Sequence, residues 1–283
     1  ESSTASRLDC MNNMIGVMQG RLLPKFQGRY QAHPVGYWKE EFFIAREMGL
    51  SCIEFILDFN DANANPLLSN TGIDEIKTVI RQTGVDVKTI CADYFMEAPL
   101  HSYDVRTAES SQILMINLLN NAEKLGVTDV VIPCVDQSTL DGKAAEDRFV
   151  ERLLPMVDIA EKHDINLSLE TDLAPQPFVK ILNRFDSTRV TVNYDIGNSA
   201  SLGYNPIEEL EAYGEKITDI HIKDRILGGA SVILGQGDAK FDSFFEKLYK
   251  INYQGPFIMQ AYRDEEGVSI FKNQLDWIKK YFI

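Results

Sequence analysis

The sequence predicts an α/β protein that folds as one closed (β/α)8 barrel. Along its 283 residues, short apolar runs alternate eight times with longer amphipathic segments. Most of the apolar runs are continuous, which is typical of parallel strands that are covered on both faces. No stretch rich in Pro, Gly or Ser divides the chain, and its length suits a single barrel. An open doubly wound sheet is the alternative, but "GVMQGRLLP" in the first unit lacks the GxGxxG spacing of a nucleotide-binding turn.

The strands are predicted where short runs of mostly apolar residues occur. These runs are Ile15–Met18, Cys52–Leu57, Val85–Cys91, Asp129–Cys134, Asn166–Glu170, Val190–Asp195, Ile217–Ile222 and Phe257–Tyr262. Segments with helical periodicity lie between them and after the last one. The predicted helices are Tyr37–Met48, Ile73–Gln82, Thr107–Leu125, Lys143–His163, Pro175–Arg184, Pro206–Tyr213, Phe241–Lys250 and Val268–Tyr281. Gly49, Gly84 and Gly126 follow the first three helices closely, because glycine tolerates the left-handed conformation that ends a helix.

The ends and the cysteines indicate where the protein resides. Residues 1–13, "ESSTASRLDCMNN", lack the apolar core of a secretory signal, so we expect a disordered lead-in before a catalytic barrel domain at 14–283. No apolar run approaches the ~20 residues that span a membrane. The four cysteines form no CxxC pair, and Cys52, Cys91 and Cys134 lie in apolar runs. Buried free thiols fit a reducing compartment, so we expect a cytoplasmic protein without a membrane partner.

The net charge of the chain indicates which kinds of molecule it can bind. The net charge is -14, and 25% of the residues are charged. Phosphate contacts along a nucleic acid need clustered Lys and Arg, so we expect no nucleic acid partner. A local basic pocket for one small phosphate remains compatible with this charge.

The last four predicted strands carry polar residues at their carboxyl ends. These residues are Glu170, Asp195, His221 and Gln260. In a barrel the carboxyl ends of the strands form one functional rim, so the four side chains are predicted to face one another. Two carboxylates and an imidazole are good ligands for Mn²⁺, Co²⁺, Zn²⁺ or Mg²⁺, and an amide oxygen can be a weaker fourth ligand. Clustered buried charges also need a compensating partner, and a divalent cation is the simplest one.

At this point the chain shows a resemblance over nearly its whole length. The stretches "IGVMQGRLLP", "CIEFILD", "LSLETD", "NYDIGNSASLGYNP", "DIHIKDR", "LGQGDAKFD" and "GPFIMQAYRD" resemble the sugar phosphate isomerase/epimerase family of xylose-isomerase-like TIM barrels. They look most similar to ketopentose-phosphate 3-epimerases and hexulose-phosphate isomerases. The resemblance implies a divalent metal held by Glu170, Asp195, His221 and the residue at position 260. It further implies a sugar or sugar phosphate substrate and a chain that could form a homo-oligomer.

Gln260 departs from this family, which has glutamate there. The family's first and last carboxylates also act as the two acid/base groups, which assigns catalytic roles to Glu170 and to position 260. Epimerisation removes a proton from one face of a carbon and returns one to the other face, so it needs two such groups. An amide does not exchange protons near neutral pH. Three outcomes remain open: another acid replaces the missing carboxylate, one base carries out single-face isomerisation or dehydration, or the barrel only binds a sugar. The replacement acids considered are Asp224, Asp264, Glu265 and Glu97.

Further residues are predicted to bind substrate. In "LGQGDAKFD", Gly235 and Gly237 form a glycine-flanked loop before a helix, where backbone N–H groups would suit a phosphate. Lys223 and Arg225 lie near it in sequence and would add positive charge. Glu54 on the second strand resembles a residue of the family that contacts substrate or water, and Arg21 in "QGRLLP" could reach the site. A structural role is the alternative for each of these residues.

Four functions from different classes are therefore weighed. The first is a metal-dependent sugar or sugar phosphate isomerase or epimerase. The second is a metal-dependent dehydratase of a keto-polyol, and the third is a sugar-binding relative without catalysis. The fourth is a DNA repair enzyme similar to endonuclease IV. Its multi-zinc cluster needs more histidines than the four in this chain provide, and the charge of -14 also argues against it.

Overall fold

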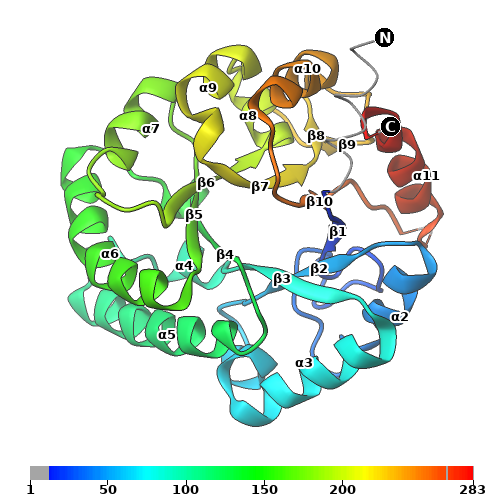
Figure 1. Cartoon of the computed structure of the whole chain (residues 1–283), viewed down its shortest axis with the longest axis horizontal. Helices are drawn as coiled ribbons and strands as arrows, with labels where there is room; N and C mark the ends of the chain where they lie inside the picture. Colours follow the sequence, from blue (N-terminus) through cyan, green and yellow to red (C-terminus); the bar gives the residue numbers. More distant parts are fainter. Residues whose placement is uncertain (1–12, 266, 283) are drawn as a thin grey trace.

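The computed structural model describes residues 13–265 and 267–282, and these form a closed parallel barrel surrounded by helices (Figure 1). The predicted lead-in lies outside the described residues, apart from Asn13. The order of strands around the barrel is β1-β10-β7-β6-β5-β4-β3-β2. Their bounds are β1 Ile15–Met18, β2 Cys52–Ile56, β3 Asp86–Cys91, β4 Asp129–Cys134, β5 Asn166–Thr171, β6 Val190–Asp195, β7 Ile217–Ile222 and β10 Phe257–Met259. The predicted closed barrel is therefore confirmed, and the open sheet is excluded.

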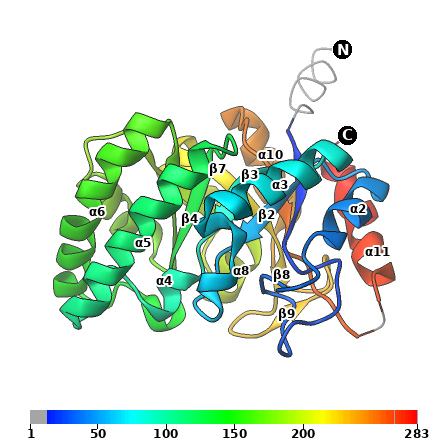
Figure 2. The same cartoon turned by 90° about the horizontal axis from the view of Figure 1, so that it is seen from below.

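The helices lie outside the strands, as Figures 1 and 2 show from two directions. Their bounds are α2 Glu40–Glu47, α3 Asn70–Thr83, α4 Tyr94–Glu97, α5 Val105–Glu123, α6 Lys143–His163, α7 Pro175–Leu182, α8 Ile196–Leu202, α9 Pro206–Tyr213, α10 Phe241–Ile251 and α11 Ser269–Ile278. The sequence did not predict the short helices α4 and α8. It also missed the hairpin of β8 (Asp224–Arg225) and β9 (Ser231–Val232). All three follow the carboxyl ends of strands, where they build the rim of the barrel.

The main apolar core lies between the barrel and its helices. It contains buried side chains from nearly every strand and helix, among them Phe42, Phe55, Phe149 and Phe244. A smaller apolar cluster, including Met18, Cys52 and Ile258, fills part of the barrel interior. The first strand approaches the second so closely that a β-carbon on Gly16 would lie 2.6 Å from the carbonyl oxygen of Cys52. Glycine at this position therefore allows the barrel to close.

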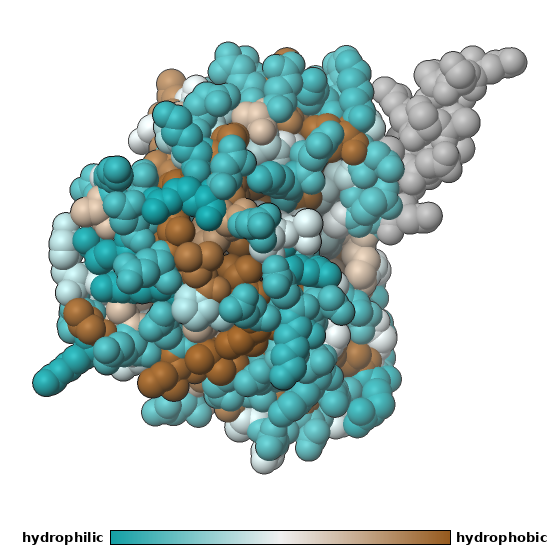
Figure 3. All heavy atoms as spheres, turned by 60° about the vertical axis from the view of Figure 1, so that its left-hand side comes forward, coloured by the Kyte–Doolittle hydropathy of each residue, from teal (hydrophilic) through white to brown (hydrophobic). Residues whose placement is uncertain are grey.

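The outer surface is mixed in character. Figure 3 shows hydrophobic patches among mostly hydrophilic side chains on the side that carries α5 to α7. None of the helices in the described part of the chain is long and apolar enough to cross a membrane. Cys52, Cys91 and Cys134 are buried free thiols, as predicted.

Two strand boundaries matter for the site. β10 ends at Met259, earlier than the predicted end at Tyr262, because the chain leaves the barrel there. Gln260 is consequently the first residue after the strand, although its N–H still donates to the carbonyl oxygen of Ile222 at 3.0 Å. β5 extends one residue beyond Glu170, to Thr171.

Candidate functional site

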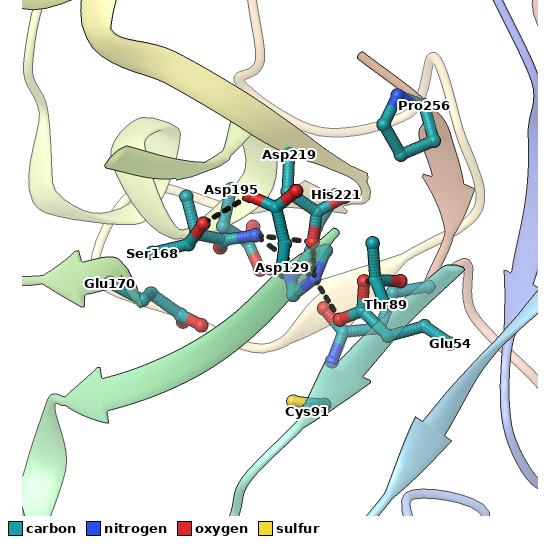
Figure 4. Close-up of polar contacts among 12 residues, drawn as sticks. Glu54, Thr89, Cys91, Asp129, Ser168, Glu170, Asp195, Asp219, His221 and Pro256 are labelled. Atoms are coloured by element: carbon teal, nitrogen blue, oxygen red, sulfur yellow. Dashed lines mark hydrogen bonds and ion pairs between the residues drawn. The ribbon is translucent and has the colours of Figure 1, made fainter. Parts of the chain in front are cut away.

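Neighbouring strands place Asp195 and His221 side by side at the carboxyl end of the barrel. Asp195 is the last residue of β6, and the parallel register pairs it with His221 on β7. His221 is also paired with Ile258 of β10, two residues before Gln260. Glu170 comes from β5, and Figure 4 shows its side chain pointing toward the same region as Asp195 and His221. All four side chains are buried, and Glu170 and Gln260 keep 9% and 8% of their surface exposed.

Both ring nitrogens of His221 lie near acidic side chains. Its Nε2 atom lies 2.6 Å from Glu54 Oε1, and its Nδ1 atom lies 3.7 Å from Asp195 Oδ2. Burial lowers the pKa of the imidazole, but the charge of Glu54 and the contacts with Asp195 and Asp219 raise the pKa well above its ordinary value. Without a metal, these acids therefore favour the protonated, positively charged form of His221.

Several buried polar atoms near this end have no hydrogen-bond partner among the described residues, and three of them belong to the predicted metal ligands. These three are Asp195 Oδ2, His221 Nδ1 and Gln260 Oε1. Lys223 Nζ lies 3.2 Å from Asp195 Oδ2, so the two form an ion pair, although not one with hydrogen-bond geometry. Buried polar atoms are paired in nearly all proteins, and an unpaired group in a native structure calls for a missing partner. Two oxygens and one imidazole nitrogen are a donor set that fits a divalent cation.

The pKa values of Asp195 and Glu170 shift in opposite directions. Burial alone would raise the pKa of Asp195, but the positive charges of Lys223 and His221 hold it well below its ordinary value. Burial and the negative charge of Asp195 raise the pKa of Glu170 to about 7, although the positive charges of His221 and Lys223 act to lower it. Asn198 Nδ2 donates to Glu170 Oε1 at 3.0 Å, and the Asn198 N–H donates to Asp195 Oδ1 at 2.8 Å. Asn198, in α8, thereby orients both acids.

A second group of acids lies deeper in the barrel. Glu54 Oε2 accepts a hydrogen bond from Thr89, and Asp219 Oδ2 accepts one from Asn193 (Figure 4 labels all of these except Asn193). Glu54, Asp219 and His221 lie close enough together to suggest a metal site of their own. Because Glu54 already occupies Nε2 of His221, we interpret this group as the support that orients the ring and leaves Nδ1 facing the rim.

Glu54 therefore has a different position from the one expected of it. It was expected to contact substrate or water, but it has no exposed surface and hydrogen-bonds His221 and Thr89. Arg21 is also buried, and its Nη1 atom donates to Gln31 Oε1 at 2.6 Å. Burial lowers the pKa of Arg21 to about 10, while nearby Asp93 and Glu41 act in the opposite direction. It thus remains positively charged behind the rim.

A cavity of about 340 Å³ opens beside these residues. Six of the side chains that line it are polar or charged and matter most here: Gln31, Asp93, Glu170, Lys223, Arg225 and Gln260. Its volume is in the range of small-molecule sites. A larger cavity, about 650 Å³, lies at the other end of the barrel, next to Met14 and Tyr253. The smaller one is the candidate site, because function in this fold is built on the carboxyl ends of the strands.

The glycine loop has another role than the one expected. The N–H groups of Gly235 and Gly237 both donate to Asp224 Oδ2 at 2.9 Å, and that of Ala239 donates to Asp224 Oδ1 at 3.1 Å. The donors assigned to a phosphate are thus occupied by a buried carboxylate, and neither glycine lines the 340 Å³ cavity. Of the residues expected to bind a phosphate, Lys223 and Arg225 are the ones that line it.

Sequence reasoning missed Gln31 and Asp93. Gln31 lies in the long loop after β1, where no periodic pattern marks it. Asp93 is the second residue after β3, so it shows the same signal as the acids at other strand ends. The neighbouring aromatic residues Tyr94 and Phe95 drew attention away from it.

Comparison with known proteins agrees with this fold. The chain belongs to the xylose isomerase-like TIM barrel family, whose model matches residues 42–281. L-ribulose-5-phosphate 3-epimerase UlaE of Salmonella paratyphi A is 24% identical over 264 residues, which cover 88% of this chain and 92% of the relative. A solved D-psicose 3-epimerase, determined in the presence of D-fructose, is 15% identical, with a TM-score of 0.74 over 95% of this chain and 99% of the other. The solved IOLI protein with a bound zinc atom is 18% identical, with a TM-score of 0.73 over 95% and 99%.

Proposed function

We propose that the protein is a metal-dependent isomerase or epimerase that moves a proton next to the carbonyl of a sugar or sugar phosphate. Glu170, Asp195 and His221 hold the divalent cation, and the amide oxygen of Gln260 is the fourth ligand. The observation that carries the proposal is the set of buried atoms on Asp195, His221 and Gln260 that have no hydrogen-bond partner. The family, and relatives named as sugar epimerases, support the choice of reaction.

The cation, when bound, would withdraw electron density from a carbonyl oxygen and so ease removal of the adjacent proton. Glu170 is the base for that proton, since it is a carboxylate that lines the cavity and is held by Asn198. Gln260 orients a substrate hydroxyl or the cation without taking a proton. Lys223 and Arg225 would face a phosphate, because they are cationic side chains of the cavity wall.

Calorimetry with Mn²⁺ tests the metal site. Asp195→Asn keeps an oxygen for the N–H of Asn198 but removes one negative charge, so we expect Mn²⁺ affinity to fall by at least ~10-fold. Asp172→Asn is the matched control, because Asp172 lines the same cavity and is not a proposed ligand. Equal Mn²⁺ affinity in the wild type and in both variants would contradict the assignment.

The reaction is tested with L-ribulose 5-phosphate and D-fructose in heavy water with Mn²⁺. We expect deuterium to enter the carbon next to the carbonyl, and Glu170→Gln to abolish this exchange. A product that has lost water would indicate the keto-polyol dehydratase instead. Sugar binding by calorimetry without exchange into either sugar would indicate the non-catalytic relative.

A further inference from the structure

A chain of polar contacts leads from Gln260 to Asp93. Gln260 Nε2 donates to Gln31 Oε1 at 3.0 Å, and Gln31 Nε2 donates to Asp93 Oδ2 at 3.0 Å. Arg21 donates to the same oxygen of Gln31, which fixes the orientation of its amide. Gln31 therefore connects Gln260 with Asp93. At position 260 the family has its second carboxylate, and Asp93 is a carboxylate that this chain has on another loop.

Asp93 has the placement of a reacting group. It lines the same cavity as Glu170 and is only partly buried. Its other oxygen, Oδ1, lies 3.3 Å from Cys91 Sγ, which is a weak donor. Asp93 follows β3 and Glu170 lies in β5, and β4 separates these two strands in the barrel.

The other acids considered do not have this placement. Asp224 accepts three backbone N–H groups, and Glu265 forms a surface ion pair with Lys25. Glu97 is exposed and accepts from Gln137, and neither it nor Asp264 lines the cavity. Asp172 does line the cavity, but it follows Glu170 on the same strand end and cannot face it from another strand.

We propose that Asp93 is the second acid/base group of the reaction and replaces the carboxylate that Gln260 lacks; this rests on the proposed function. Glu170 takes the proton from the carbon next to the carbonyl, and the electrons of that C–H bond form the double bond of an enediolate. The protonated carboxyl of Asp93 returns a proton to the opposite face of the same carbon, and the carbonyl re-forms. Glu170 then gives its proton to solvent water and Asp93 takes one up, which returns the enzyme to its starting state. In the reverse reaction the two groups exchange roles, and no other reactant is consumed.

The experiment separates proton removal from epimer formation. L-ribulose 5-phosphate and D-fructose are each incubated with Mn²⁺ in heavy water, and NMR follows both deuterium entry and the epimeric product. For Asp93→Asn we expect exchange within several-fold of wild type, because Glu170 is intact. We expect epimer formation to fall by roughly 10²–10⁴-fold. Mn²⁺ affinity, measured by calorimetry, should not change.

Two further variants make the result specific. Asp136→Asn removes the same charge from another residue of the cavity wall and should keep both activities. The double variant Asp93→Asn/Gln260→Glu places a carboxylate back on the β10 side and should recover epimer formation. Recovery would show that the single variant lost a proton donor and not its fold.

Each other outcome overturns the inference. Epimer formation by Asp93→Asn at the wild-type rate would leave the proposed function standing and refute the role of Asp93. Equal loss of exchange and epimer formation, with Mn²⁺ binding intact, would make Asp93 a substrate-binding residue instead. A wild-type protein that shows neither reaction with either sugar would overturn the proposed function together with the inference.

Discussion

His33 is a histidine that the fold keeps neutral. Its ring lies among Trp38 and Phe55, at centroid distances of 6.0 and 5.2 Å, and only 3% of the residue is exposed. Burial lowers its pKa to about 4. Between that value and the ordinary pKa near 6.5, the unfolded chain binds the proton and the folded chain does not. Stability contributed by this site is therefore complete above about pH 6.5 and is lost as the pH falls toward 4.

His33→Phe removes this pH dependence while keeping an aromatic ring in place. When the pH is lowered from 7 to 5, protonation of His33 in the unfolded chain should reduce the unfolding free energy of the wild type by about 2 kcal/mol. The variant should not show this reduction. Urea denaturation at the two pH values measures the difference. If the free energies of the two proteins fall in parallel, another group is responsible for the acid sensitivity.

At the scale of elements, one glutamate of α2 orders the start of the long loop after β1. Glu41 has no exposed surface. Its carboxylate accepts from the N–H of Gly20 with both oxygens, at 2.8 and 3.0 Å, and from the N–H of Leu22 at 2.9 Å. The same loop carries Gln31. Glu41 of α2, a helix outside the barrel, therefore helps to position a loop that lines the cavity.

Glu41→Ala should destabilise the protein by roughly 2–4 kcal/mol, because two buried N–H groups lose their acceptor. The neighbouring variant Glu40→Ala is the control: it changes the same helix on its exposed side and should cost less than ~0.5 kcal/mol. Urea midpoints measure both. Similar shifts for the two variants would mean that the loop does not depend on Glu41.

At the scale of the whole molecule, the barrel interior contains several acidic side chains. Glu54, Asp129, Asp195 and Asp219 are all buried in the interior. Burial, with the charge of Asp219, raises the pKa of Asp129 to about 6, even though Ser168 and Thr218 donate to it. His221 forms an ion pair with Glu54 inside the barrel, and Lys223 forms one with Asp195 at the rim. A divalent cation at the rim would therefore stabilise the entire fold.

Adding Mn²⁺ at about 100 times its dissociation constant should stabilise the folded state by ~2.7 kcal/mol. For a chain of this size that corresponds to a rise of about 5 °C in the melting temperature. Calorimetric scans with Mn²⁺ and after EDTA should show the rise and its reversal. Asp195→Asn should show a smaller rise. Equal melting temperatures with and without Mn²⁺ would be evidence that the metal does not stabilise the fold.

The sequence predicted the barrel because each parallel strand is a local apolar run that can be recognised by itself. It also indicated Glu170, Asp195 and His221 as a candidate site, since the fold brings the carboxyl ends of strands together. It could not show that the amides of Gly235 and Gly237 bind Asp224, because their spacing suits either a phosphate or a carboxylate. The contact between Gln31 and Asp93 joins residues 62 positions apart across an irregular loop, and no periodic pattern encodes such a contact.

The single amide of Gln31 also links the evolution of two positions. A carboxylate at position 260 would face the oxygen Oε1 of Gln31 and repel it. If the Gln31 amide turned by half a turn, Oε1 would face the carboxylate of Asp93 instead. Gln260→Glu and Asp93→Asn each need one nucleotide change, yet each alone leaves a poorer arrangement than both together. The two arrangements are two mutations apart, and we expect either single change to form the epimer more slowly than both changes together. Relatives with Gln at the position of Gln31 should accordingly carry an acid at one of these two positions and not at both.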